Sequence, residues 1–144
     1  MLKDIVSRKL VACDPDSKVS YAAKLMDQEN VGCVLILDND KPRGLLTDRD
    51  IVVRCVAQHV DVDDTTVENV MTESLATVRE TDGIFDCIEI MHGAKVRRIP
   101  VVDEMNHVVG IVSFDDLLSV LGREMYELSG ITTRAEEAEL KKAA

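Results

Sequence analysis

Apolar residues recur at helical spacing in two separate stretches of the chain. Both stretches have them at positions i, i+3, i+4 and i+7, which places them on one face of a helix and predicts that this face is buried. The residues are Val19, Ala22, Ala23 and Met26 in the first stretch and Ile84, Cys87, Ile88 and Met91 in the second. Polar pairs precede both stretches, and we expect Asp16-Ser17 and Thr81-Asp82 to supply the helix caps.

Short apolar or β-prone runs bounded by polar residues lie on both sides of each predicted helix. The continuous apolar runs at 34–37 and 99–102 are typical of strands that are covered on both faces. Strands are expected at 10–13, 34–37 and 44–46 in the first half and at 75–78, 99–102 and 108–112 in the second. The turn-rich breaks at 38–42 and 103–107 make the last two strands of each half a hairpin.

Two further helices, at about 48–56 and 114–121, give the order β–α–β–β–α twice. The polar, acidic stretch 58–65 is the expected linker, so the units span 1–57 and 66–122. The tail, 123–144, has no counterpart in the first half. Gly130 is expected to end one helix there and Thr133 to begin the capping box of another, in a tail that either packs on a partner subunit or frays.

The two halves also repeat each other residue by residue. The sequence Gly44-Leu-Leu-Thr-Asp-Arg-Asp-Ile51 returns 66 positions later as Gly110-Ile-Val-Ser-Phe-Asp-Asp-Leu117, and upstream of this motif the offset is 65. Repeats of this length indicate a duplicated supersecondary unit. We therefore predict an α+β fold in which two small units share one core.

Composition and charge narrow the classes of function. The chain has 144 residues, four of them aromatic, and a net charge of −10, which repels a nucleic-acid backbone or an anionic membrane surface. Its four cysteines show no CxxC spacing, which argues against a zinc site and favours buried free thiols. The chain begins without an apolar signal segment, and we expect a cytosolic protein with reduced cysteines.

The repeated motif carries the candidate binding chemistry. Thr47 and Ser113 fall where a strand turns into a helix, whose unpaired N–H groups and dipole favour an anion such as phosphate. Asp50 and Asp116, three residues on, could accept hydrogen bonds from the two hydroxyls of a ribose. The same spacing is also a capping box, which would only stabilise the helix.

Basic residues lie near the motif, whereas residues typical of catalysis or metal binding do not form a recognisable set. Arg49, Lys95, Arg97 and Arg98 are the basic residues near the expected anion sites, and their alternative role is to pair with nearby aspartates. No nucleophile, base or metal-ligand set is apparent, and His59, His92 and His107 share no ligand spacing. We therefore expect a protein that is not an enzyme and needs no metal.

The repeated unit, the two Gly-to-Asp motifs and the run Arg97-Arg98-Ile99-Pro100-Val101-Val102-Asp103 resemble a tandem pair of cystathionine β-synthase (CBS) domains over roughly residues 1–122. The resemblance implies a pseudo-twofold pair with two clefts that bind adenosine compounds such as AMP, ADP, ATP or S-adenosylmethionine. It also implies a homodimer and a regulatory role toward a protein target.

Carried over by position, the resemblance assigns the ligand contacts. Asp50 and Asp116 would hold ribose hydroxyls, with Thr47 and Ser113 beside them. The adenine would lie along the backbone near Val11, Ala76, Val78, Ile99 and Pro100, and Arg49, Arg97 and Arg98 would meet a phosphate. The first copy has Gly32-Cys33 where the second has Arg97-Arg98, so its cleft would need an arginine from the other copy.

Two functions remain open at this point. The first is a regulatory module that binds an adenine nucleotide and signals to a partner. The alternative is a structural dimerisation module without a physiological nucleotide. In either case the two apolar helix faces predict a homodimer, because a unit this small would otherwise leave much of them in water.

Overall fold

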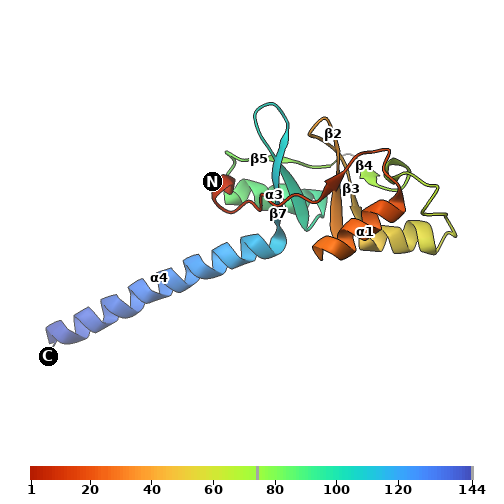
Figure 1. Ribbon diagram of the computed structural model, residues 1–144. Helices are drawn as coiled ribbons and strands as arrows, with labels where there is room; N and C mark the ends of the chain where they lie inside the picture. Colours follow the sequence, from red (N-terminus) through yellow and green to blue (C-terminus); the bar gives the residue numbers. More distant parts are fainter. Residues whose placement is uncertain (74, 144) are drawn as a thin grey trace. The chain divides into compact units, whose positions relative to one another are not determined.

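The computed structural model describes residues 1–73 and 75–143 and divides them into two compact units, residues 1–112 and 113–144 (Figure 1). The first half contains η1 (Leu2–Asp4), β1 (Ala12–Cys13), α1 (Val19–Glu29), β2 (Cys33–Asp38), β3 (Lys41–Thr47), α2 (Asp48–Ile51) and the π-helical η2 (Val52–Val56). The second half contains η3 (Val67–Asn69), β4 (Thr72–Glu73), β5 (Val78–Arg79), α3 (Ile84–Ala94), β6 (Arg98–Val102), β7 (Val108–Ser113) and α4 (Phe114–Ala143). The predicted α+β class and the repeated order of elements are confirmed.

The strands form two sheets, one for each copy of the repeat. The first sheet has the order β1-β2-β3-β4, with β1 parallel to β2 and the other neighbours antiparallel. The second has the order β5-β6-β7, with β5 parallel to β6. Leu35 of β2, Val102 of β6 and Val108 of β7 pack in one apolar cluster, so the two copies share a core, as the repeat predicts.

The segment before each copy pairs with the sheet of the other copy. Ser7 forms an antiparallel bridge with Ile111 of β7, and Thr72 of β4 pairs with Leu45 of β3. Residues 2–7 and 67–72 are also related by the 65-residue offset, and their first apolar residues, Leu2 and Val67, are fully buried. The copies are therefore interlocked through their leading segments, a relation that the sequence prediction missed because it expected the first element of each unit at residue 10 or 75.

The predicted helix caps are wrong. Lys18, not Asp16-Ser17, is the N-cap of α1, and the first N–H groups of this helix donate to the linker carbonyls of Thr65 and Val62 (both 3.0 Å). In α3 the N-cap is Gly83, whose N–H donates to Asp86 Oδ2 (3.1 Å). Long-range hydrogen bonds from the linker thus replace the local side-chain cap at α1.

The apolar stripe of α1 is covered inside the chain. Val19, Ala22 and Met26 pack in a core with Val34, Ile36 and Leu46, and in α3 Cys87 and Met91 are likewise buried. Most of each stripe is thus covered within the chain, and the stripes by themselves do not require a partner subunit. A homodimer stays a prediction that needs a different surface.

The final helix also differs from the prediction. Residues 114–143 form one continuous helix, α4, which passes through Gly130 and Thr133 without a break (Figure 1). Gly and Thr lower helix propensity by at most about 1 kcal/mol each, which surrounding residues with good propensity offset.

Candidate functional site

The first copy of the repeated motif forms a reciprocal pair of hydrogen bonds. The Thr47 N–H donates to Asp50 Oδ2 (3.0 Å), and the Asp50 N–H donates to Thr47 Oγ1 (3.1 Å). Both residues are half-buried at the junction of β3 and α2. The predicted capping box is therefore present. Its two hydrogen bonds hold the Asp50 carboxylate in one orientation.

The second copy repeats this geometry within the second compact unit. Asp116 Oδ2 accepts hydrogen bonds from the Ser113 N–H (2.8 Å) and the Ser113 hydroxyl (2.7 Å), and the Asp116 N–H donates to Ser113 Oγ (3.2 Å). These two residues are half-buried as well. The duplicated motif thus presents the same hydroxyl and carboxylate chemistry twice.

An arginine of the second copy lies within electrostatic range of the first. Arg98 lies close enough to Cys33 to favour its thiolate, although burial, the strongest influence, raises the pKa of this thiol and Asp48 raises it further. Cys33 pairs with Thr47 across β2 and β3, so Arg98 lies near the first motif. The first copy, which has no arginine at this position of its own, therefore has one nearby.

The other expected contact residues differ in exposure. Arg49 and Arg97 are exposed at the surface, and Val11 and Ala76 are half-buried. Val78, Ile99 and Pro100 are buried within the chain, so a ligand beside them would meet backbone rather than these side chains. Of the aspartates that could pair with these arginines, Asp103 instead lies beside His107 (Nδ1 to Oδ2, 3.4 Å).

Asp103 organises the turn between β6 and β7. Its carboxylate accepts hydrogen bonds from the His107 N–H (2.8 Å) and the Met105 N–H (2.9 Å). The bond from His107 is the main reason that the pKa of Asp103 is lowered. This side chain therefore stabilises the turn.

Arg54 is a contact of the first motif that sequence reasoning missed. Its Nη2 lies 3.4 Å from Asp50 Oδ1, and its Nη1 donates to the Val70 carbonyl (2.7 Å). The i, i+4 spacing of Asp50 and Arg54 was a usable signal, because residues at this spacing meet on a helix surface.

The glycines of the motif accommodate the chain itself. A Cβ on Gly110 would clash with the Val6 side chain and lie 2.6 Å from the Ser7 carbonyl oxygen, and one on Gly44 would lie 2.9 Å from the Thr72 carbonyl oxygen. The space beside these two glycines is therefore filled by the chain itself and not left open for a ligand. They admit the leading segment of the other copy.

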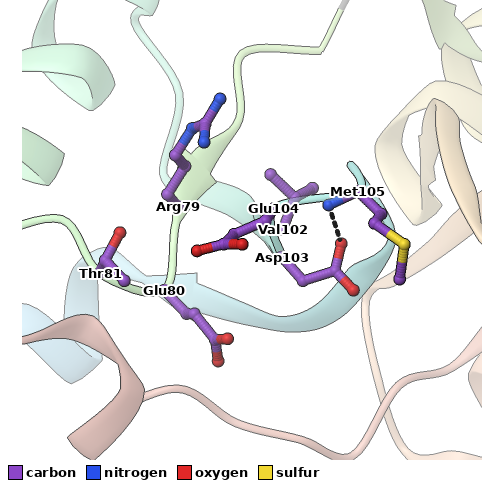
Figure 2. A pocket seen from close by; sticks show the side chains of 7 residues that line it. All are labelled: Arg79, Glu80, Thr81, Val102, Asp103, Glu104 and Met105. Carbon is purple, nitrogen blue, oxygen red and sulfur yellow. Dashed lines mark hydrogen bonds between the residues drawn. The ribbon is translucent and has the colours of Figure 1, made fainter.

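A cavity of about 400 Å³ lies away from the repeated motif, at the ends of β5 and β6 (Figure 2). It is lined by Arg79, Glu80, Thr81, Val102, Asp103, Glu104 and Met105. Three carboxylates against one guanidinium would repel a phosphate. We therefore do not assign the nucleotide to this cavity.

The cysteines are free, and Cys13, Cys55 and Cys87 are buried while Cys33 is half-buried. Burial is the strongest influence on all four thiols and raises the pKa of each. Across residues 1–73 and 75–143, no three His, Cys, Asp or Glu side chains converge to hold a metal ion. Over the same residues, no helix is both long and apolar enough to cross a bilayer.

Comparison with known proteins also finds two copies of one domain in this chain. The CBS domain profile matches the chain twice, at residues 2–56 and 67–123. The CBS domain-containing protein YhcV of Bacillus subtilis is 35% identical over 81% of this chain and 81% of its own length. The chain spans 60% or less of several longer curated relatives.

Solved structures show the same fold. The CBS domain structure of NE2398 has a TM-score of 0.72 and 31% identity, and covers 80% of this chain and 90% of that one. The CBS domain pair of MJ0100, in complex with 5′-methylthioadenosine and S-adenosyl-L-methionine, has a TM-score of 0.75 and 28% identity, and covers 86% of this chain and 97% of that one.

Proposed function

The chain belongs to the CBS domain family, and we propose that it is a regulatory module that binds an adenosine compound through its repeated hydroxyl and carboxylate motif. The observation that carries the proposal is the geometry of this motif. Each copy fixes an aspartate carboxylate at the start of a helix by hydrogen bonds from the residue three positions earlier. A fixed carboxylate can accept both vicinal hydroxyls of a ribose without losing side-chain freedom on binding.

In this proposal, each residue has a role that its chemistry fits. Asp50 and Asp116 accept the ribose hydroxyls, with Thr47 and Ser113 beside them. The cations that meet a phosphate are Arg49, Arg97 and Arg98. Backbone along the adenine is supplied near Val11, Ala76, Val78, Ile99 and Pro100.

The related MJ0100 pair, which holds two adenosine compounds, supports the choice of ligand class. AMP, ADP, ATP and S-adenosylmethionine are all candidates, since each contains the ribose that the motif fits. Binding would be passed to a protein target by a change in the chain, without catalysis, and we propose that the cytosolic homodimer is the form that signals.

The motif geometry also favours a second function. Because both hydrogen-bonded caps are complete within the chain, the motif is able to serve the fold alone. In that case the chain would be a structural dimerisation module, and no adenosine compound would change its stability.

A ligand panel separates the two functions. Melting temperatures are measured with AMP, ADP, ATP, S-adenosylmethionine and, as a control without adenosine, GMP, followed by calorimetric titration of those that raise the melting temperature. A ligand that binds only the folded state at 100 times its Kd adds about 2.7 kcal/mol to the free energy of unfolding. Equal melting temperatures throughout the panel would exclude the regulatory proposal in favour of the structural one.

A further inference from the structure

We propose that Arg54 competes with a ribose for the carboxylate of Asp50 and thereby makes the first copy the weaker of the two binding motifs. The inference rests on the proposed function and identifies the residue that sets the difference in affinity between the copies. The two motifs are otherwise alike, because both have the reciprocal backbone N–H hydrogen bonds, although the Ser113 hydroxyl also donates to Asp116 Oδ2.

Both oxygens of the Asp50 carboxylate are engaged within the chain. Oδ2 accepts the Thr47 N–H (3.0 Å), and Oδ1 lies 3.4 Å from Arg54 Nη2. A ribose presents two vicinal hydroxyls, which are best matched by one hydrogen bond to each oxygen. The guanidinium group therefore competes with one of the two hydroxyls for Oδ1.

Two further hydrogen bonds hold the Arg54 guanidinium in this place. Its Nη1 donates to the Val70 carbonyl (2.7 Å), and its Nη2 donates to Thr72 Oγ1 (3.1 Å). The Arg54 side chain is 41% exposed and that of Asp50 is 18% exposed, so water weakens the ion pair only in part. These bonds tie the first motif to the segment that leads into the second copy.

The second copy lacks this competitor. The residue 66 positions after Arg54 is Val120, which carries no charge. Among the residues that the structure describes, the hydrogen bonds to the Asp116 carboxylate all fall on Oδ2. Oδ1 of Asp116 is thus left for a hydroxyl of the ligand.

The backbone around Arg54 is also specific to the first copy. Residues Val52–Val56 form a π-helical turn, in which the Ala57 N–H donates to the Val52 carbonyl (2.9 Å), whereas the corresponding part of α4 is α-helical. Single π turns occur frequently at functional sites. Arg54 also lines an open hollow of about 610 Å³ with Val53, Gln58 and Val70, which offers the guanidinium room to move away when a ribose binds.

The test separates competition for the Asp50 carboxylate from binding of phosphate. An arginine that binds phosphate strengthens AMP binding and leaves adenosine binding unaffected, whereas a competitor for Asp50 weakens adenosine binding. Calorimetric titrations therefore use adenosine and AMP.

Each change is made in a chain in which the other motif is disabled. The Arg54→Val change is made in a chain that carries Asp116→Ala, so that only the first motif is measured. The reverse change, Val120→Arg, is made in a chain that carries Asp50→Ala.

We expect Arg54→Val to tighten adenosine binding about two- to fivefold, the range of a partly exposed ion pair, and Val120→Arg to weaken it by a similar factor. The matched control is Thr72→Val, which removes one contact of Arg54 but leaves its pair with Asp50. This control should tighten adenosine binding less than Arg54→Val does, because the pair with Asp50 and the bond to the Val70 carbonyl remain. A gain equal to that of Arg54→Val would show that loosening of β4 causes the effect and would overturn the proposal.

Unchanged adenosine binding in Arg54→Val also overturns the proposal. If AMP binding is weaker in the same variant, Arg54 is a phosphate contact instead. If Arg54→Val does not fold, as judged by its melting curve, Val120→Arg decides alone, and an unchanged Kd there rejects the competition. If the wild-type chain binds neither adenosine nor AMP, the proposed function itself fails and the inference with it.

Discussion

Asp116 shows how one side chain can serve both the fold and a ligand. Its carboxylate takes two hydrogen bonds from Ser113 on one oxygen, which satisfies the start of α4. A carboxylate has about four acceptor positions, so the cap uses only part of its capacity. The cap and the ribose contact predicted from the same spacing are therefore compatible.

The first prediction concerns this residue. We expect Asp116→Ala to weaken adenosine-compound binding at least about tenfold, because hydrogen bonds to a charged group contribute about 1.5–3 kcal/mol each. Asp50→Ala should have a smaller effect, since Arg54 already engages that carboxylate. Calorimetric titration measures both variants, with melting curves as the control for folding.

A purely structural cap gives a different result for the same variants. Losing an acid from the first helical turn would lower the free energy of unfolding by about 0.3–1 kcal/mol through the helix dipole and leave the Kd unchanged. Equal affinities of wild type and Asp116→Ala would therefore contradict the ribose role.

The second prediction concerns the buried thiols and pH. Burial raises the pKa of Cys87 above its ordinary value of 9.0, so the folded chain holds this proton longer than the unfolded chain does. The stability contributed by the thiol is complete below pH 9 and is lost as the pH rises through the pKa of the folded state. We expect the free energy of unfolding, measured by urea titration between pH 7 and 11, to fall above pH 9.

Cys87→Ala provides the comparison. The variant should be less stable at every pH because of the cavity, yet its stability should decline less steeply above pH 9, by up to about 1.4 kcal/mol per pH unit. If the free energy of unfolding fell equally steeply with pH in wild type and Cys87→Ala, the raised pKa of Cys87 would be contradicted.

At the scale of elements, the leading segments hold the two copies together. Ser7 of the first segment pairs with β7, and Thr72–Glu73 of the second pair with β3, each segment against a glycine of the repeated motif. Each copy thus lacks part of its own sheet edge and receives it from the other. This exchange explains why the offset between the copies extends upstream to the first residues of the chain.

The third prediction tests this contact. Gly110→Ala places a methyl group 2.6 Å from the Ser7 carbonyl oxygen, where backbone has to move. We expect a loss of about 1–3 kcal/mol in the free energy of unfolding, measured by urea titration.

Gly93→Ala is the matched control, because its methyl group would meet nothing within 4 Å on α3. This change should raise stability by about 0.5–1 kcal/mol through the helix propensity of Ala. Equal effects of the two substitutions would mean that the leading segment does not press on Gly110.

At the scale of the whole molecule, α4 carries several large apolar side chains that are exposed. Met125 is 70% exposed and Leu128 is 64% exposed, and with Leu118 and Leu121 they follow the three- and four-residue spacing of one helix face. Arg123, Glu127, Arg134, Glu137 and Lys141 lie on the opposite face. A helix with one apolar and one charged face is typical of a helix that packs on a partner.

The fourth prediction follows from this face. We expect the full chain to be a homodimer at tens of micromolar and a chain that ends at residue 122 to dissociate at lower concentrations, because truncation removes Met125 and Leu128. Sedimentation velocity over a concentration series measures both chains. A monomeric full chain would contradict the dimer, and equal dissociation constants would exclude the tail from the interface.

The sequence by itself determined the duplicated α+β unit, the positions of most strands and helices, and the paired hydroxyl and carboxylate. These features depend on periodicity and on neighbours within one helical turn, as in Thr47 and Asp50 or Ser113 and Asp116. Local physics suffices for them, because side chains three or four residues apart meet whatever the rest of the chain does.

Only the tertiary structure decided the features that join distant segments. The start of α1 is held by linker carbonyls, the motif glycines face the leading segment of the other copy, and Arg98 lies near Cys33. Arg54 likewise gains its role from Val70 and Thr72, which are 16 and 18 residues away. Such contacts leave no periodic trace in the sequence, because they depend on how the two copies fold against each other.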